Sequence, residues 1–255
     1  MIAVLGLGEA GAAIAGDLAR AGARVTGFDP VAEAPEGVEP AAAAAEAVAG
    51  ADLVLSVNSA AVALELAVGV ASALPPRPLY ADLNTSAPAL KRALAAAVEP
   101  HGAAFADVAL MEPVPDWGVR TPALASGSGA ERFGSELRTY GMPVTTVGPE
   151  PGAAAARKLA RSVFMKGQAA AIGEALAAAQ RLGCEEWLYA NIESTLARAD
   201  ARLLRRLVQG SRTHAARRVD EMAAAVEMLE ELEVPPHVAA ASEAWLRSLA
   251  AGAPR

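Results

Sequence analysis

The sequence predicts two domains: an α/β domain with a doubly wound parallel sheet over residues 1–150, and an all-α domain over residues 151–255 that begins with a long interdomain helix. Three observations support this prediction. Short apolar runs alternate with helical stretches up to about residue 147, the rhythm of a parallel sheet with right-handed crossovers. Residues 151–255 contain long helical patterns and no convincing strand. A chain of 255 residues is also long enough for two cores.

The expected elements of the first domain follow in chain order. The strand IAVLG is followed by a helix to about residue 21, the strand ARVTGFD and a helix near residues 41–49. The strand ADLVLSVN, a helix from residue 60 and the strand PLYADL come next. A helix over 88–98 leads to GAAFADVAL, and PALASG and PVTTVG close the domain as two further strands.

The second domain is expected to be helical throughout, with breaks at residues 182–183, 210–211 and 234–236. Its first helix, over about 152–182, would be roughly 45 Å long at the helical rise per residue. A helix of that length usually bridges domains or subunits. Because aromatic residues are only 4% of the chain, we expect the helical domain to bury its apolar stripes against a second copy, in a homodimer.

Composition and charge favour a small-molecule protein of the cytoplasm. The net charge of −7 comes from mixed signs without a basic block, so nucleic acid and anionic membranes are not expected partners. A single cysteine and three dispersed histidines give neither a disulfide framework nor metal-ligand spacing. The longest apolar stretch, AAVALELAVGVASAL, is too short to span a bilayer and contains Glu65. The first residues lack the basic start of a signal peptide.

A glycine-rich turn, GLGEAG, lies between the first strand and the first helix. In this context the first glycine permits the tight turn, the second lets the backbone approach a pyrophosphate, and the third lets the helix pack closely on the strand. The helix N-terminus supplies N–H groups and partial positive charge to the phosphates. The pattern predicts a Rossmann domain that binds a dinucleotide through Gly6, Leu7, Gly8, Glu9, Ala10 and Gly11. Glu9, unusual beside phosphates, is expected to cap the helix start.

Polar residues at the ends of later strands extend the expected cofactor site. Asp29 ends the second strand, where an acidic side chain accepts hydrogen bonds from an adenosine ribose and repels a 2′-phosphate. No arginine follows directly in DPVAEAPEG, so NAD is favoured and NADP stays open. Asn58, Ser59 and Asn84 follow later strands at the same sheet edge, where the nicotinamide half would lie.

Five motifs follow one another along the chain: GLGEAG, VNSAAVALE, ADLNTSAP, FADVALMEPV and GAAAARKLARSVFMKG. Together they resemble the β-hydroxyacid dehydrogenase superfamily, which includes 3-hydroxyisobutyrate and 6-phosphogluconate dehydrogenases. GEAG and the K-x-x-R-S-x-x-x-K-G pattern are similar to a branch whose C-terminal domain is related to that of 6-phosphogluconate dehydrogenases. The resemblance implies an NAD(P)-dependent oxidoreductase that transfers hydride between nicotinamide and an anionic hydroxyacid or its keto form.

The same resemblance assigns roles along the long helix. Lys158 occupies the position of the family's general base, and Ser162 stands where many members have an asparagine that holds the substrate hydroxyl. By resemblance to 6-phosphogluconate dehydrogenases, Lys166 would pair with a remote carboxylate or phosphate. The three residues have the spacing i, i+4, i+8, so they share one stripe of the helix. His214 and Arg217 are candidates to complete the anion site, in one reading from a partner subunit.

The substrate loop departs from the family pattern. The usual serine and glycines are replaced by Met111, Glu112 and Pro113, which cannot form the same anion pocket. The ordinary short hydroxyacids are therefore not the expected substrates. Two alternatives stay open: an imine reductase, against which the retained Lys158 argues, and a dinucleotide-binding sensor or scaffold without catalysis.

Overall fold

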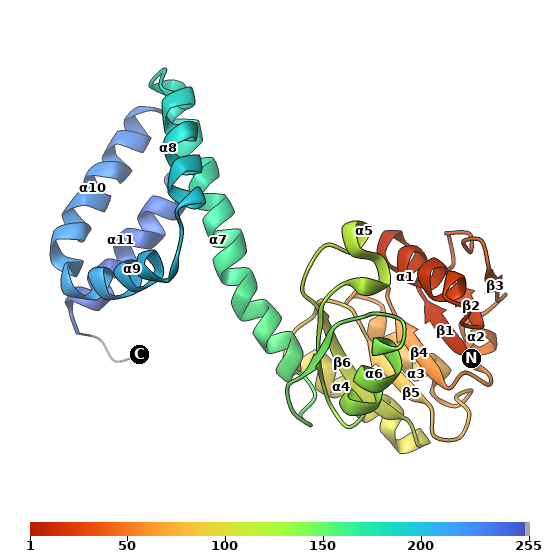
Figure 1. Cartoon of the computed structure of the whole chain (residues 1–255). Helices are drawn as coiled ribbons and strands as arrows, with labels where there is room; N and C mark the ends of the chain where they lie inside the picture. The colour runs from red at the N-terminus through yellow and green to blue at the C-terminus, as the bar shows by residue number, and fades with distance from the viewer. Residues whose placement is uncertain (253–255) are drawn as a thin grey trace. The chain divides into compact units, whose positions relative to one another are not determined.

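The computed structural model describes residues 1–252, which fold into two compact units, the first over Met1–Arg161 and the second from Ser162 onward. The first unit is an α/β sandwich and the second is helical (Figure 1). The predicted fold class, a doubly wound α/β domain followed by an all-α region, is confirmed. The division between the units falls inside the long helix.

The first unit contains one eight-stranded sheet with the order β3-β2-β1-β4-β5-β6-β7-β8. The first six strands run parallel, in the order of a dinucleotide-binding sheet. From β1 the chain adds strands first toward one edge of the sheet and then, from β4 on, toward the other edge, so the topological switch point lies between β1 and β4. The strands are β1 (Ile2–Leu5), β2 (Val25–Phe28), β3 (Val38–Pro40), β4 (Leu53–Ser56), β5 (Leu79–Asp82), β6 (Ala104–Leu110), β7 (Ala123–Ser126) and β8 (Val144–Thr146).

The expectation of a fully parallel sheet is wrong for the last two strands, which run opposite to the first six. β7 pairs antiparallel with β6, while β8 pairs parallel with β7. The link between β6 and β7 holds only short turns, α5 (Val114–Trp117) and a 3₁₀ turn at Gly118–Arg120. A parallel return needs a long crossover, usually a full helix, so here the chain reverses instead.

Helices cover both faces of the sheet (Figure 1). On one face, Ile14 and Leu18 of α1 and Phe133 of α6 belong to the larger apolar cluster. On the other face, Leu94 of α4 packs in a second cluster with Tyr80 and residues of α2 and α3. The helices are α1 (Glu9–Arg20), α2 (Ala44–Val48), α3 (Ala63–Ala71), α4 (Pro88–Val98) and α6 (Ala130–Arg138). The sequence patterns did not predict β3, α5 or α6.

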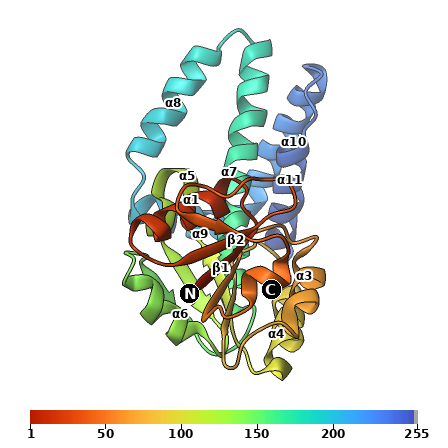
Figure 2. The same ribbon diagram turned by 90° about the vertical axis from the view of Figure 1, so that its right-hand side faces the viewer.

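The long helix α7 (Ala153–Arg181) has 29 residues and is followed by α8 (Glu185–Ala197), α9 (Ala201–Thr213), α10 (Ala215–Glu231) and α11 (His237–Ala250). Within the second unit α10 and α11 lie side by side (Figures 1 and 2). The breaks predicted at 182–183 and 234–236 are confirmed, but the one at 210–211 is wrong because α9 continues through it. The helices instead break at His214, between α9 and α10, and at 198–200, where the carboxylate of Asp200 accepts hydrogen bonds from the first turn of α9.

The second unit has a small core. Among the described residues its buried apolar cluster contains only Ala178, Leu229, Val234 and Ala239. None of the residues of α8 is buried, and Trp187 on that helix is 66% exposed. Within residues 1–252, no helix is both long enough and apolar enough to cross a membrane.

Candidate functional site

The glycine turn has two kinds of glycine. Gly6 has a φ of +102°, and a Cβ there would lie 2.4 Å from the carbonyl oxygen of Val57. A Cβ on Gly11 would lie 1.9 Å from the carbonyl oxygen of Gly6. Gly8 differs, because no other heavy atom of the described residues lies within 4 Å of the position its Cβ would take. The fold itself requires glycine at positions 6 and 11, whereas at Gly8 the open space faces solvent.

The helix behind this turn begins without a side-chain cap. Gly8 is the N-cap residue of α1, and within residues 1–252 no side chain accepts a hydrogen bond from the first N–H groups of this helix. The expected capping by Glu9 is therefore wrong. An uncapped helix N-terminus beside an open glycine backbone can accept an anionic group. The residues present therefore fit the pyrophosphate of a dinucleotide.

Asp29, just past the end of β2, is tied to the glycine turn. Its Oδ2 accepts a hydrogen bond from the N–H of Leu7 at 2.8 Å, and its Oδ1 accepts from the N–H groups of Val31 and Ala32, each at 2.9 Å. Burial raises the pKa of Asp29, but the three N–H donors outweigh it and lower the pKa below its ordinary value. The side chain is therefore a carboxylate at neutral pH.

A pocket of about 740 Å³ opens beside the glycine turn at the carboxyl end of the sheet. Two carboxylates, Asp29 and Glu65, line it, and none of its described lining residues is basic. Such a pocket suits a ribose and an apolar ring better than a 2′-phosphate. Its lining residues are Gly6, Gly8, Phe28, Asp29, Pro30, Ala44, Ala45, Val57, Asn58, Ser59, Val62, Glu65, Leu66, Gly69 and Val70.

A second pocket of about 490 Å³ shares four lining residues with the first, Gly8, Val57, Asn58 and Ser59. The two pockets therefore adjoin at the glycine turn. The second one contains the predicted Lys158, which is half-buried on the second turn of α7. Its other lining residues are Glu9, Ala10, Ala60, Leu83, Asn84, Thr85, Leu110, Glu112 and Val114.

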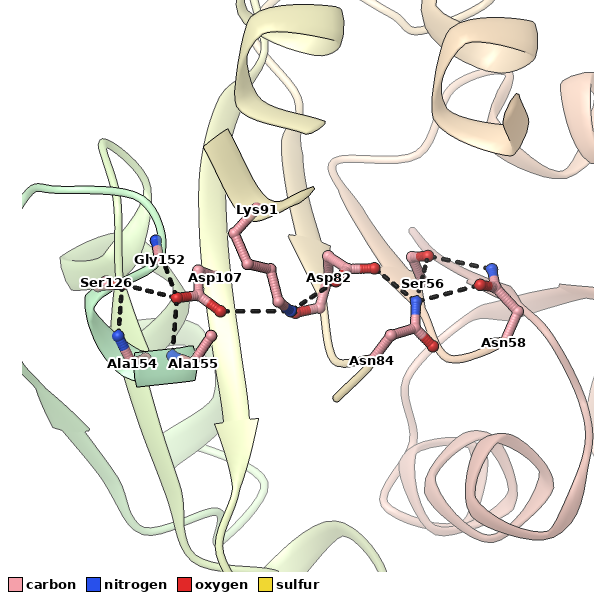
Figure 3. Close-up of polar contacts among 10 residues, drawn as sticks. All are labelled: Ser56, Asn58, Asp82, Asn84, Lys91, Asp107, Ser126, Gly152, Ala154 and Ala155. Atoms are coloured by element: carbon pink, nitrogen blue, oxygen red, sulfur yellow. Dashed lines mark hydrogen bonds and ion pairs between the residues drawn. The ribbon is translucent and has the colours of Figure 1, made fainter. Parts of the chain in front are cut away.

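A row of buried polar side chains crosses the sheet beneath this second pocket. Ser56, Asp82, Asp107 and Ser126 are register partners on four neighbouring strands, and all four are fully buried. At one end of the row, the Nδ2 of Asn84 donates to Asp82 at 2.5 Å and also contacts Ser56 and Asn58 (Figure 3). The pocket residue Asn84 is thus oriented by the row.

Lys91 of α4 is the cation of this row, and sequence reasoning missed it. Its Nζ lies 2.5 Å from Asp82 Oδ2 and 3.2 Å from Asp107 Oδ1, with 1% of the side chain exposed. Removing one partner from such a buried ion pair typically costs about 3–5 kcal/mol. The sequence pattern could have indicated its burial, because Lys91 is the first residue of the stripe that continues with the apolar Leu94 and Val98.

The substrate loop is held by α7. Arg161 donates to the carbonyl oxygen of Met111 at 3.0 Å and forms an ion pair with Glu112 at 3.1 Å. Glu112 lines the second pocket, while Pro113 is the N-cap residue of α5. The loop therefore presents a carboxylate, itself paired with a cation, beside Lys158.

The remaining predicted residues lie in the second unit, and their roles stay predictions. Ser162 is half-buried and Lys166 is exposed, both on α7. His214 is an exposed residue between α9 and α10, and Arg217 forms an ion pair with Glu221. Among residues 1–252, no group of three or more histidine, cysteine or acidic side chains could hold a metal ion.

Two family models match different parts of the chain. The model for the NAD binding domain of 6-phosphogluconate dehydrogenase matches residues 1–111, and that for a domain of unknown function, DUF1932, matches residues 179–249. A curated relative, an uncharacterised 28.5 kDa protein from the 7S RNA 5′ region of Methanothermus fervidus, is 26% identical over 144 residues. That match covers 56% of this chain and spans only 55% of the relative.

Solved structures of dehydrogenases and reductases are also similar to this chain. A conserved hypothetical protein from Sinorhizobium meliloti 1021 is 31% identical, with a TM-score of 0.63 over 97% of this chain and 87% of that one. The 3-hydroxyisobutyrate dehydrogenase of Mycobacterium tuberculosis is 29% identical, with a TM-score of 0.64 over 72% of this chain and 66% of that one. An imine reductase from Myxococcus stipitatus in complex with NADP⁺ shares the fold, with a TM-score of 0.82 at 23% identity over 99% and 95% of the two chains.

These matches confirm the resemblance to dehydrogenases and the NAD(P) cofactor. Residues 1–111 are an NAD-binding domain, and they contain the glycine turn, Asp29, Asn58 and Asn84 described above. The chain belongs with proteins that join the NAD binding domain of 6-phosphogluconate dehydrogenase, here residues 1–111, to a DUF1932 domain, here residues 179–249.

Proposed function

We propose that the protein is an NAD-dependent dehydrogenase, or a reductase in the reverse direction, for an anionic hydroxyacid or its keto form. Lys158 is the general acid/base in this proposal. The observation that carries it is the position of Lys158 in the second pocket, together with Asn58, Ser59 and Asn84 at the carboxyl edge of the sheet. That pocket adjoins the one lined by Asp29 and the glycine turn.

The proposed chemistry uses few protein groups. Nicotinamide, when bound, supplies the two-electron acceptor for a hydride from the alcohol carbon. The amine of Lys158 takes the hydroxyl proton as the C–H bond breaks, which leaves a carbonyl product and an ammonium group on Lys158. In the reverse direction the ammonium returns that proton to the carbonyl oxygen. Asn84, oriented by Asp82 and Ser56, forms part of the wall of the pocket.

The substrate is expected to be larger than the short hydroxyacids. Glu112 occupies the loop that would otherwise offer donors to a small carboxylate, and it is already paired with Arg161. Ser162 and Lys166 follow Lys158 on the same face of α7, so they are our candidates for further substrate contacts. His214 and Arg217 are weaker candidates, since Arg217 is paired with Glu221.

We also propose that two copies of the chain associate through the helical unit. Its buried apolar cluster is small, whereas Phe164, Trp187 and Leu204 are each more than 60% exposed. Large exposed apolar side chains on three helices of this unit support the proposal that they pack against a second copy.

The test compares the Lys158→Met variant with Arg181→Met, a control that removes a cation from an exposed position on the same helix. Hydroxyacids of increasing length are screened with NAD, and cyclic imines with NADH, by absorbance of the reduced cofactor. We expect wild-type turnover of a hydroxyacid, loss of it by at least about 100-fold in Lys158→Met, and unchanged NAD affinity in both variants.

Other outcomes would replace the proposal. Full activity of Lys158→Met would refute its role as the acid/base group. Turnover of imines without any hydroxyacid would assign an imine reductase. NAD binding without turnover in either panel would favour a dinucleotide-binding sensor.

A further inference from the structure

A continuous chain of buried polar contacts links the pocket edge of the sheet to the first turn of α7 (Figure 3). On the pocket side, Asn84 donates to Asp82 Oδ1. In the middle, Lys91 contacts Asp82 and Asp107. On the far side, Asp107 contacts the backbone of residues 152–155. Every residue of this network of contacts lies within the first unit.

The start of α7 is capped by side chains that come from other strands. The residues before the helix, Glu150, Pro151 and Gly152, include none of the side chains preferred at an N-cap. Instead, Asp107 Oδ2 accepts hydrogen bonds from the N–H groups of Gly152 at 3.1 Å and Ala155 at 3.0 Å.

Ser126 completes this cap from β7. Its Oγ accepts a hydrogen bond from the N–H of Ala154 at 3.0 Å and donates one to Asp107 Oδ2, also at 3.0 Å. Strands β6 and β7 therefore anchor the first turn of the helix from outside. The negative charge of Asp107 also faces the positive end of the α7 dipole.

Lys91 holds the other oxygen of the capping carboxylate. Asp107 Oδ1 is fully buried and accepts no hydrogen bond in the described structure, so its ion pair with Lys91 at 3.2 Å is its polar contact there. The same ammonium group contacts both Oδ2 and the backbone oxygen of Asp82. A buried charge needs such partners, so the positions of Lys91, Asp82 and Asp107 depend on one another.

We propose that Lys91 and Asp107 are positioning residues for Lys158. Lys158 lies three residues beyond Ala155, about one turn further along α7, so the location of the capped turn sets where its side chain enters the pocket. Through Asp82, Lys91 also orients Asn84 on another wall of the same pocket. This inference rests on the proposed function in one respect: the placement of Lys158 affects catalysis only if Lys158 is the acid/base group.

The lysine content of the chain allows a direct test. Only three of the 22 basic side chains are lysines: buried Lys91, half-buried Lys158 and exposed Lys166. A small amine-acylating reagent followed by mass spectrometry therefore measures the acylation rate of Lys158, with that of Lys166 as an internal reference in the same molecule. Both acylation rates are measured across pH, with and without NAD.

The main variant is Asp107→Asn, which keeps the Lys91–Asp82 pair, and the second is Lys91→Met. The matched control is Asp220→Asn, the same chemical change at an exposed position of α10. We expect Asp107→Asn to keep NAD affinity, to change the Lys158-to-Lys166 rate ratio and its pH profile, and to weaken any protection of Lys158 by NAD. Turnover should fall by up to about 100-fold through kcat, as for a misplaced catalytic group. The control should match wild type in every measurement.

Two results would overturn the inference. The first is a labelling ratio and pH profile identical to wild type in a folded Asp107→Asn variant. The second is loss of NAD binding together with all other properties in Asp107→Asn, which would make the network a general stabiliser of the unit. If Lys91→Met does not fold, Asp107→Asn alone decides. Because labelling needs no turnover, its outcome stands apart from the Lys158→Met test of the proposed function.

Discussion

Replacing Asp29 by asparagine tests whether one carboxylate selects NAD over NADP. Asp29 lines the larger pocket and stays ionised at neutral pH because three N–H donors lower its pKa. The second acidic residue of that pocket is Glu65, and no described lining residue is basic. A 2′-phosphate placed near Asp29 would therefore meet negative charge without compensation.

The expected magnitude follows from the half-exposed position of Asp29. Two unit charges 4 Å apart interact by about 1 kcal/mol in bulk water and by about 4 kcal/mol near a protein surface. Taking about 2 kcal/mol between these limits gives a preference for NAD on the order of 30-fold. Asparagine removes this repulsion. It also removes a charged acceptor for the ribose hydroxyls, a loss of roughly 1.5–3 kcal/mol in NAD affinity.

The assay measures the dissociation constants of NAD and NADP for wild type, Asp29→Asn and the control Glu36→Gln. Glu36 is an exposed carboxylate that follows the same strand and lies outside the pocket. We expect the NAD-to-NADP preference to fall by about 30-fold in Asp29→Asn and to stay at the wild-type value in the control. An unchanged preference in Asp29→Asn would refute the electrostatic reasoning.

Stability in acid gives an independent check on the same carboxylate. Because the pKa of Asp29 is lower in the folded chain than its ordinary value of 3.8, its stabilising contribution is present above that value. The contribution is lost as the pH falls through the lowered pKa. Below about pH 4, the free energy of unfolding should therefore depend less steeply on pH in Asp29→Asn than in wild type. A pH dependence equal to that of wild type would show that the three N–H donors do not stabilise the carboxylate.

Three further predictions concern other parts of the chain. Gly8→Ala should leave the melting temperature unchanged and weaken NAD binding. Gly11→Ala should destabilise the fold by roughly 1–3 kcal/mol, because its Cβ would lie 1.9 Å from a backbone oxygen. Equal effects of the two substitutions on stability would contradict this prediction. Burial raises the pKa of Tyr80, so spectrophotometric titration should show a fraction of the tyrosine absorbance that changes only on alkaline unfolding. Ionisation of Tyr80 in the folded protein would be the contrary result. Light scattering should give about twice the chain mass of 25.8 kDa, and Trp187→Glu should shift the protein toward monomer; a wild-type monomer would rule out the dimer.

Local patterns in the sequence were sufficient for most of the first unit. The alternation of apolar runs and helical stretches predicts β1, β2 and the five strands that follow α2, because periodicity reports which face of an element is buried. The glycine turn and Asp29 were recognisable for a similar reason: their spacing relative to one strand and one helix is contained in about thirty consecutive residues. The position of Lys158 came from the resemblance, since its helix-face environment alone does not distinguish a base from a solvated lysine.

Only the tertiary structure decided what depends on residues far apart in the sequence. The reversal at β7 depends on how the link after β6 packs, and periodicity does not report strand direction. The cap of α7 comes from Asp107 and Ser126, on two strands that precede the helix, and its charge is balanced by Lys91 on a third element. The partners of a buried charge are chosen by proximity in space, so no local pattern could have identified this network.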